Sequence, residues 1–138
     1  MGYLFDTDTF SNLMRRTPSQ ILVRRLAATD PAEQFTSSVT LGELVYGAHR
    51  LAERTQELLE RINAVLGELL PVLAFDSAAA RLYGKLRADL ERIGRPIGNA
   101  DLQIAAICLV HGHTVVTVNV RHFEQVPGLG VENWLVEP

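Results

Sequence analysis

The sequence predicts an α/β protein, a three-layer α/β/α sandwich built around a mainly parallel sheet. Short apolar runs, typical of strands buried on both faces, alternate with segments of helical periodicity. Pro, Gly and cap-forming residues separate these segments. The chain has 138 residues, 47% of them hydrophobic, which is enough for one ordinary core. We therefore expect residues 1–138 to form a single domain.

The expected elements follow from apolar periodicity and cap signals. Strands are predicted over residues 3–5, 34–38, 71–75, 114–118 and 130–134. Helices are predicted over 10–16, 19–28, 40–48, 53–70, 77–92 and 99–111, with one turn at 121–125. In the helix over 99–111, Asn99 is the expected N-cap and Gly112 the expected C-terminal stop. Almost every side chain between these two caps is apolar, so we expect this helix to be buried on most sides.

Composition narrows the function classes. No run of about 18 apolar residues and no signal-like N-terminus is present, so we expect a cytoplasmic protein without a membrane span. The single cysteine, Cys108, excludes an intrachain disulfide and a cysteine-based zinc site. The net charge of −3 gives no overall attraction to nucleic acid, although all but one of the 13 basic residues are Arg, which suits local phosphate contacts.

Acidic and amide side chains fall at one predicted edge of the sheet. Asp6 ends the first strand, Glu43 lies early in the helix after the second, and Asn119 lies just past the fourth. Asp101 joins them provided that its helix starts at the same edge. Ligands of open parallel sheets bind at this carboxyl edge, near the point where the strand order reverses.

Carboxylates this close together repel, and a hard divalent cation removes the repulsion. We therefore predict that Asp6, Glu43 and Asp101 hold Mg²⁺ and support the attack of water on a phosphodiester. Each residue also has a simpler interpretation: Asp6 as a helix cap, Glu43 as the partner of Thr40 in a capping box, and Asp101 as an acid favoured by the helix dipole. Asn119 alone reads as a turn residue.

The acids in their local contexts resemble the PIN-domain family, and within it the VapC toxins of type II toxin–antitoxin systems. The resemblance covers nearly the whole chain. Its segments are Tyr3-Leu4-Phe5-Asp6-Thr7, Leu41-Gly42-Glu43-Leu44-Val45-Tyr46-Gly47-Ala48, Ile97-Gly98-Asn99-Ala100-Asp101-Leu102-Gln103-Ile104-Ala105-Ala106, Val116-Thr117-Val118-Asn119-Val120-Arg121-His122-Phe123, and the tail from Val126 to Trp134.

This resemblance implies a PIN-like fold and a Mg²⁺- or Mn²⁺-dependent ribonuclease in which Asp6, Glu43 and Asp101 match the family's acids. Asn119 stands where many members have a fourth acid, so the resemblance does not decide whether a second metal ion binds. Thr7 matches a small hydroxyl residue that positions water or a carboxylate. The resemblance also implies a homodimer neutralised by an antitoxin. Arg121, close to Asn119, is the expected phosphate contact for the RNA substrate.

Two other functions stay open. A phospho-receiver domain also has Mg²⁺-binding acids at strand ends, but it needs a Lys after its last central strand, and Lys85 lies within a predicted helix. A catalytically degenerate PIN scaffold would keep the fold without the chemistry. Cys108 reads as an inert core residue, and the His111-Gly112-His113 pair reads as a helix C-terminus rather than a metal site.

Overall fold

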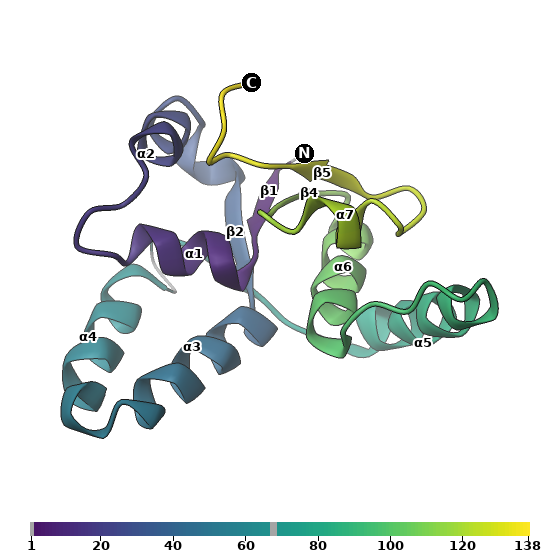
Figure 1. Cartoon of the computed structure of the whole chain (residues 1–138), viewed down its shortest axis with the longest axis horizontal. Coiled ribbons are helices and arrows are strands. Elements are labelled where there is room, and N and C mark those ends of the chain that lie inside the picture. The colour runs from purple at the N-terminus through teal and green to yellow at the C-terminus, as the bar shows by residue number, and fades with distance from the viewer. Residues whose placement is uncertain (1, 67–68) are drawn as a thin grey trace.

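The computed structural model describes residues 2–66 and 69–138, and a parallel five-stranded sheet lies at its centre (Figure 1). The strand order is β3-β2-β1-β4-β5, and each neighbouring pair is parallel. The strands are β1 (Tyr3–Phe5), β2 (Gln34–Ser37), β3 (Val72–Leu73), β4 (Thr114–Val116) and β5 (Gly130–Glu132). The predicted α/β class with a mainly parallel sheet is confirmed.

Helices connect successive strands on both faces of this sheet (Figure 1). The α-helices are α1 (Thr7–Leu13), α2 (Gln20–Ala27), α3 (Ser38–Arg50), α4 (Thr55–Val65), α5 (Ser77–Arg92), α6 (Asn99–His111) and α7 (Val120–Phe123). Two 3₁₀ turns, η1 (Pro31–Glu33) and η2 (Ala52–Arg54), complete the described elements. None of the described helices is long and apolar enough to cross a lipid bilayer.

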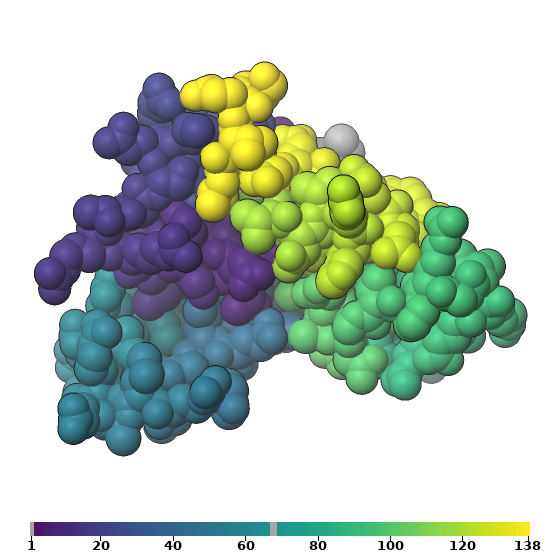
Figure 2. Space-filling view, in the orientation of Figure 1, coloured from purple at the N-terminus to yellow at the C-terminus, as the bar shows by residue number. Residues whose placement is uncertain are grey.

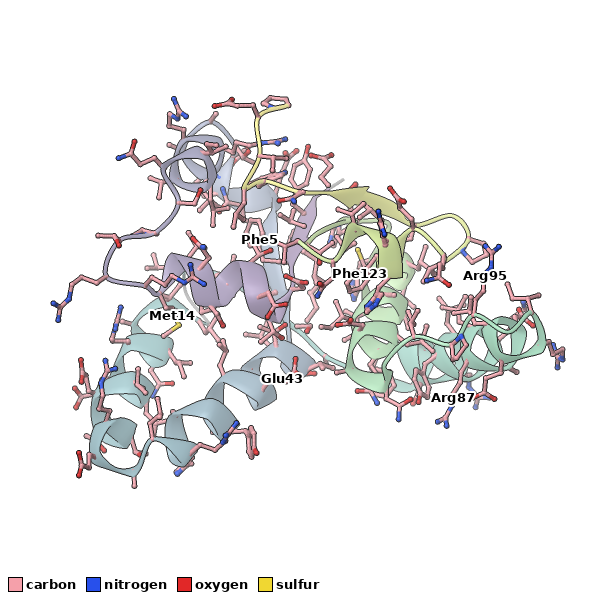
Figure 3. All side chains as sticks on the ribbon, viewed as in Figure 1. Phe5, Met14, Glu43, Arg87, Arg95 and Phe123 are labelled. Atoms are coloured by element: carbon pink, nitrogen blue, oxygen red, sulfur yellow. The ribbon has the colours of Figure 1, made fainter. Side chains whose placement is uncertain are left out.

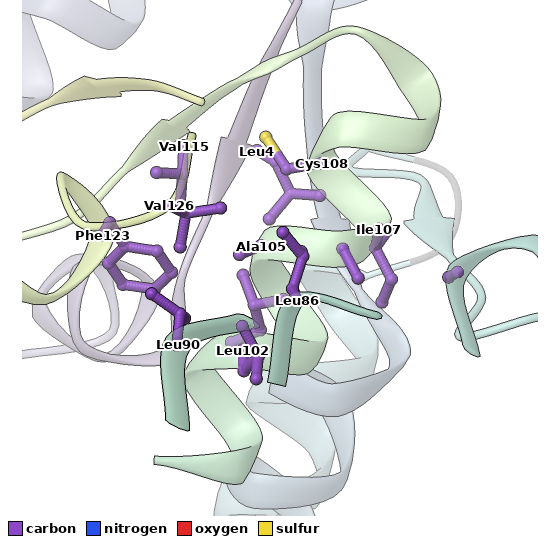
Figure 4. Close-up of a cluster of buried hydrophobic side chains, with 13 residues drawn as sticks. Leu4, Leu86, Leu90, Leu102, Ala105, Ile107, Cys108, Val115, Phe123 and Val126 are labelled. Carbon is purple, nitrogen blue, oxygen red and sulfur yellow. The ribbon is translucent and has the colours of Figure 1, made fainter. Parts of the chain in front are cut away.

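Alternate residues of the central strands point into two separate cores. Leu4 of β1 pairs in register with Val115 of β4, and both pack against α5, α6 and α7 (Figure 4). Phe5 and Val116, the next pair, pack on the opposite face with Phe10 of α1 and residues of α2 and α4. Burying each such side chain contributes about 1.5–3 kcal/mol. Each core lies between the sheet and the helices on one face of it, so the molecule has three layers.

The topology singles out the carboxyl ends of β1 and β4. From β1 the chain adds β2 and then β3 on one side, and later β4 and β5 on the other. The strand order therefore reverses between β1 and β4, the place where parallel sheets leave a crevice for ligands.

Two predicted helices have different bounds in the structure. The first helix starts at Thr7 rather than Phe10, because the side chain of Asp6 caps it: Oδ1 accepts a hydrogen bond of 3.0 Å from the backbone N–H of Thr9. The helix predicted over 53–70 ends at Val65. Leu66 is already extended, and it forms a bridge to the buried Leu70. Residues 67–68 of this prediction lie outside the described residues.

The buried helix α6 lies much as predicted. It begins at Asn99 itself, with Gly98 and not Asn99 at the N-cap position. Gly112 ends it in the left-handed conformation, with φ of 68°, as the C-cap pattern predicts. Six side chains of α6, from Leu102 to Cys108, are buried in the core.

Candidate active site

Asp6 is a buried carboxylate at the carboxyl end of β1. Its side chain is 2% exposed and accepts two hydrogen bonds, one from Thr9 N–H at 3.0 Å and one from Thr117 Oγ1 at 2.5 Å. Burial raises the pKa of Asp6 above its ordinary value; the hydrogen bonds from Thr117 and Thr9 oppose this shift, and the charge of nearby Asp8 adds to it. Among the described residues, no Lys, Arg or His side chain forms an ion pair with Asp6.

Glu43 faces the start of α1 from the first half of α3. Glu43 (labelled in Figure 3) is exposed and accepts a short hydrogen bond from the Thr7 hydroxyl, whose oxygen also lies 3.3 Å from Thr40 Oγ1. The capping-box interpretation of Glu43 is wrong, because Ser37 is the N-cap of α3 and its Oγ accepts from Thr40 N–H at 3.1 Å. Glu43 is thus placed by the tertiary contact with Thr7.

Asp101 lies in the first turn of α6, as the third residue of the helix. Because α6 leads through Gly112 directly into the start of β4, its N-terminus lies at the opposite, carboxyl edge of the sheet. A contact across this edge supports the placement: His122 Nδ1 of α7, which follows β4, lies 3.5 Å from Asp101 Oδ2. The condition attached to Asp101 in the sequence prediction is met.

Asn119 links the end of β4 to the beginning of α1 through hydrogen bonds. Its Nδ2 donates to Asp8 Oδ2 at 3.1 Å, and its backbone N–H donates to Thr117 Oγ1 at 2.9 Å. An amide here can donate to Asp8, whereas a carboxylate would repel it. The Asn at this position is therefore matched to its acidic neighbour.

The donor set suits a hard divalent cation. Three carboxylates come from three elements at one edge of the sheet, and oxygen ligands of this kind are what Mg²⁺ and Mn²⁺ bind. Within residues 2–66 and 69–138, however, no three His, Cys, Asp or Glu side chains are gathered closely enough to form a complete metal centre. Binding of one ion by Asp6, Glu43 and Asp101 stays a prediction.

Two hollows flank this edge. The larger, about 620 Å³, lies between α1, α3 and α4, and Thr7 and Glu43 line its inner end. In the space-filling view the surface of α1, in purple, borders the surfaces of α3 and α4, in blue to teal (Figure 2). The smaller, about 430 Å³, is lined by Asn119, the exposed Arg121 and His122 among others. The expected RNA contacts Thr7 and Arg121 thus line different hollows.

Sequence reasoning missed Thr117, which is fully buried and bridges Asp6 to the backbone of Asn119. A lone threonine at the end of a strand carries no pattern of its own. The signal that could have found it is its position at the end of the strand expected to lie beside the first. His122 was missed for the same reason, because only the packing of α7 on α6 brings it to Asp101.

Other residues weighed from the sequence have structural roles. His113 Nδ1 accepts from the backbone N–H of Gly2 at 3.0 Å, and burial, with His111 nearby, lowers the pKa of His113. Burial raises the pKa of the Cys108 thiol to about 12, and Sγ contacts His113 O at 3.0 Å, so this thiol is inert. Lys85 is exposed on α5 and pairs with Asp89 at 2.6 Å, away from the strand ends where a receiver lysine belongs.

Comparison with known proteins agrees with this geometry. The family model described as PIN domain matches residues 3–129. The chain is 36% identical over 136 residues to the tRNA(fMet)-specific endonuclease VapC of Shigella flexneri, which covers 97% of this chain and 98% of that protein. It is 33% identical over 138 residues to Ribonuclease VapC2 of Haemophilus influenzae, covering 98% and 99% of the two chains.

Solved structures give the same result. The chain superposes on VapBC-1 from nontypeable Haemophilus influenzae with a TM-score of 0.88 at 30% identity, covering 99% of this chain and 100% of that one. It superposes on DNA-bound VapBC from Salmonella typhimurium with a TM-score of 0.88 at 33% identity, covering 97% and 98%. Both neighbours are VapBC structures, and they match this fold along nearly its whole length.

Proposed function

The chain belongs to the PIN-domain family, and from this premise we propose that it is a metal-dependent endoribonuclease, the toxin of a VapBC-type toxin–antitoxin pair. A VapC-type ribonuclease is supported by relatives named VapC that match nearly its full length. The observation that carries the metal dependence is Asp6, a buried carboxylate that has no cationic side chain among the described residues to offset its charge. A divalent cation offsets that charge.

In this proposal Asp6, Glu43 and Asp101 would hold the ion, each from a different element at the same edge. Bound there, the ion would activate water for attack and offset the charge that grows on the phosphate. Thr117 fixes the carboxylate of Asp6 through its 2.5 Å hydrogen bond, and Thr7 holds Glu43 toward the same edge. Asn119 orients Asp8 without adding charge. We expect Arg121, in the smaller hollow, to contact a phosphate of the RNA.

The test is cleavage of RNA by the purified protein with Mg²⁺ or Mn²⁺ added to a chelator-treated sample. Asp101→Asn and Glu43→Gln should each reduce cleavage by about 100-fold or more, because each removes a charged ligand. Glu60→Gln is the matched control: Glu60 is an exposed acid of α4 whose only hydrogen bond is to Gln56 in the described chain. Equal cleavage by wild type and Asp101→Asn would refute the assignment.

An antitoxin is the proposed partner. The acidic edge suits a partner segment that brings a basic side chain to Asp101 and Glu43 and so displaces the ion. The structural neighbours are VapBC structures, which supports such a partner. We further propose that the enzyme acts in the cytoplasm as a homodimer. Light scattering of the purified chain, alone and with a protein encoded by the adjacent reading frame, tests both associations.

The degenerate scaffold is separated from the enzyme by metal binding. A scaffold has no need for an ion among its carboxylates, so calorimetric titration with Mn²⁺ should give no heat for a scaffold and a saturable signal for the nuclease. Loss of that signal in Asp101→Asn, but not in Glu60→Gln, would place the ion at the proposed edge.

A further inference from the structure

Helix α3 carries three chemically different side chains on one face. Glu43, Tyr46 and Arg50 are spaced i, i+3 and i+7, so they follow one another along the same side of the helix. With a rise of about 1.5 Å per residue, Tyr46 and Arg50 start about 4.5 and 10.5 Å beyond Glu43 along the axis. Glu43, Tyr46 and Arg50 thus form a stripe that runs outward from the acidic edge. Along it, the acid comes first, then the aromatic ring, then the cation.

The position of Tyr46 is unusual for an aromatic residue. It is 64% exposed, and it belongs to neither hydrophobic core. Within the described residues its hydroxyl makes no hydrogen bond. Arg50 lies over the ring of Tyr46, with its Cζ 5.6 Å from the ring centre. An exposed aromatic ring backed by a cation is a platform on which a nucleic-acid base can stack.

The charge around this stripe favours a phosphate chain leading away from the acids. Arg50 forms no ion pair with a carboxylate among the described residues, whereas Arg54, the next basic residue along the chain, pairs with Glu57 at 3.2 Å. Arg15 and Arg16, which follow α1, line the larger hollow together with Glu43. The net charge of the chain is −3, so these local cations are needed if a polyanion is to approach the acidic edge.

Building on the ribonuclease function proposed above, we propose that Tyr46 stacks on a base of single-stranded RNA next to the cleaved phosphate, and that Arg50 contacts the phosphate beyond it. Unpaired bases offer a π-face to such a ring, which a base held inside a duplex does not. The stripe therefore selects unpaired RNA at the cut. Tyr46 and Arg50 act on binding and position, while the acids act on the bond.

The test measures binding separately from cleavage. In the full-length Asp101→Asn background, a short oligoribonucleotide carrying 2-aminopurine reports both affinity and stacking through its fluorescence. Tyr46→Ala should weaken binding about 5- to 150-fold, the range found for loss of one base–aromatic stack, and Tyr46→Phe should stay within about twofold. Arg50→Ala should reduce the slope of log K against log salt by about 0.7, the share of one phosphate contact on a single strand.

Matched variants remove similar groups elsewhere. Val23→Ala trims an exposed apolar residue of α2, and Arg81→Ala removes an exposed cation of α5. In the Asp101→Asn background both should bind RNA as the parent protein does, and in the wild-type background both should leave RNA cleavage unchanged. Thermal melts should show Tyr46→Ala folded, because the ring is outside both cores.

Each other outcome overturns the proposal. If wild type cleaves RNA and Tyr46→Ala binds as tightly as its parent, the stacking role fails and the ribonuclease stands. If Tyr46→Phe is as weak as Tyr46→Ala, the hydroxyl and not the ring is recognised. If Tyr46→Ala loses only antitoxin binding, the stripe is a protein interface. If wild type neither binds nor cleaves RNA, the proposed function fails and the stacking role with it.

Discussion

Replacing Thr117 by Val tests how the buried acid Asp6 is held. Thr117 is fully buried, donates to Asp6 Oδ2 at 2.5 Å and accepts from Asn119 N–H at 2.9 Å. Val has nearly the same volume and removes only the hydroxyl. Any loss of stability therefore reports these two hydrogen bonds rather than a cavity.

The magnitude follows from the two bonds. A hydrogen bond to a charged group contributes about 1.5–3 kcal/mol, and the bond to Asn119, whose surroundings are half-buried and open to water, contributes about 0.5–1 kcal/mol. Thr117→Val should thus lower the free energy of unfolding by about 2–4 kcal/mol at neutral pH. For a chain of this size that corresponds to a fall in Tm of about 8–16 °C.

The loss should depend on pH in one direction. The bond from Thr117 stabilises the ionised carboxylate and so lowers the pKa of Asp6, against the larger effect of burial that raises it. Its contribution is present while Asp6 is ionised and is lost as pH falls through the folded pKa. The difference in unfolding free energy between wild type and Thr117→Val should therefore be smaller at a pH below the folded pKa of Asp6 than at neutral pH.

Denaturant unfolding at both pH values, in the presence of a chelator, measures this difference in unfolding free energy. Two further variants serve as controls. Thr117→Ser keeps the hydroxyl and should stay near wild type. Thr36→Val removes a buried hydroxyl that donates to the neutral Phe5 carbonyl at 2.9 Å, so its loss should be about 1 kcal/mol and independent of pH. If Thr117→Val loses no more than Thr36→Val, with no change with pH, the reasoning about Asp6 is wrong.

Three further predictions concern the acids and the amino edge of the sheet. Asp6→Asn should raise Tm in chelator at neutral pH while abolishing cleavage. Burial raises the pKa of Asp6, so its ionised form costs stability above the unfolded pKa, and the gain in Tm should vanish below about pH 4. Asn119→Asp replaces the amide that donates to Asp8 at 3.1 Å by a second carboxylate. In urea melts without metal it should lower the free energy of unfolding by about 1 kcal/mol. In calorimetric titrations it should bind Mn²⁺ more tightly than wild type. The lowered pKa of His113 means that neutral imidazole is favoured by folding, so stability should fall as pH drops below about 6.5, and His113→Gln should flatten that dependence in thermal melts. A gain in Tm with His113→Gln at neutral pH would contradict a structural role for its bond to Gly2.

Much of the fold could be predicted because its signals are local. Residues 3–5 form a strand as expected, Ser19 caps α2, and Gly112 ends α6 in the left-handed conformation. These outcomes depend on side chains within a few residues of one another, so a single sequence contains what decides them.

Element lengths were less predictable because tertiary contacts override local preference. The amphipathic pattern continues past Val65, yet α4 ends there and Leu66 turns to pair with Leu70. The strand predicted over 114–118 ends at Val116, because the next residue, Thr117, turns its hydroxyl to Asp6. Each change places a side chain where another part of the chain requires it.

The sequence by itself determined that this protein is a parallel α/β sheet whose first strand and two helices carry acids. Strand ends and helix starts follow from apolar runs and caps, and in a parallel sheet they fall at known edges. Only the tertiary structure decided how those acids are held: Asp6 by Thr117, Glu43 by Thr7 and Asp101 beside His122. These pairs are separated by 21 to 111 residues, and a contact over that distance exists only once the packed cores have fixed both backbones.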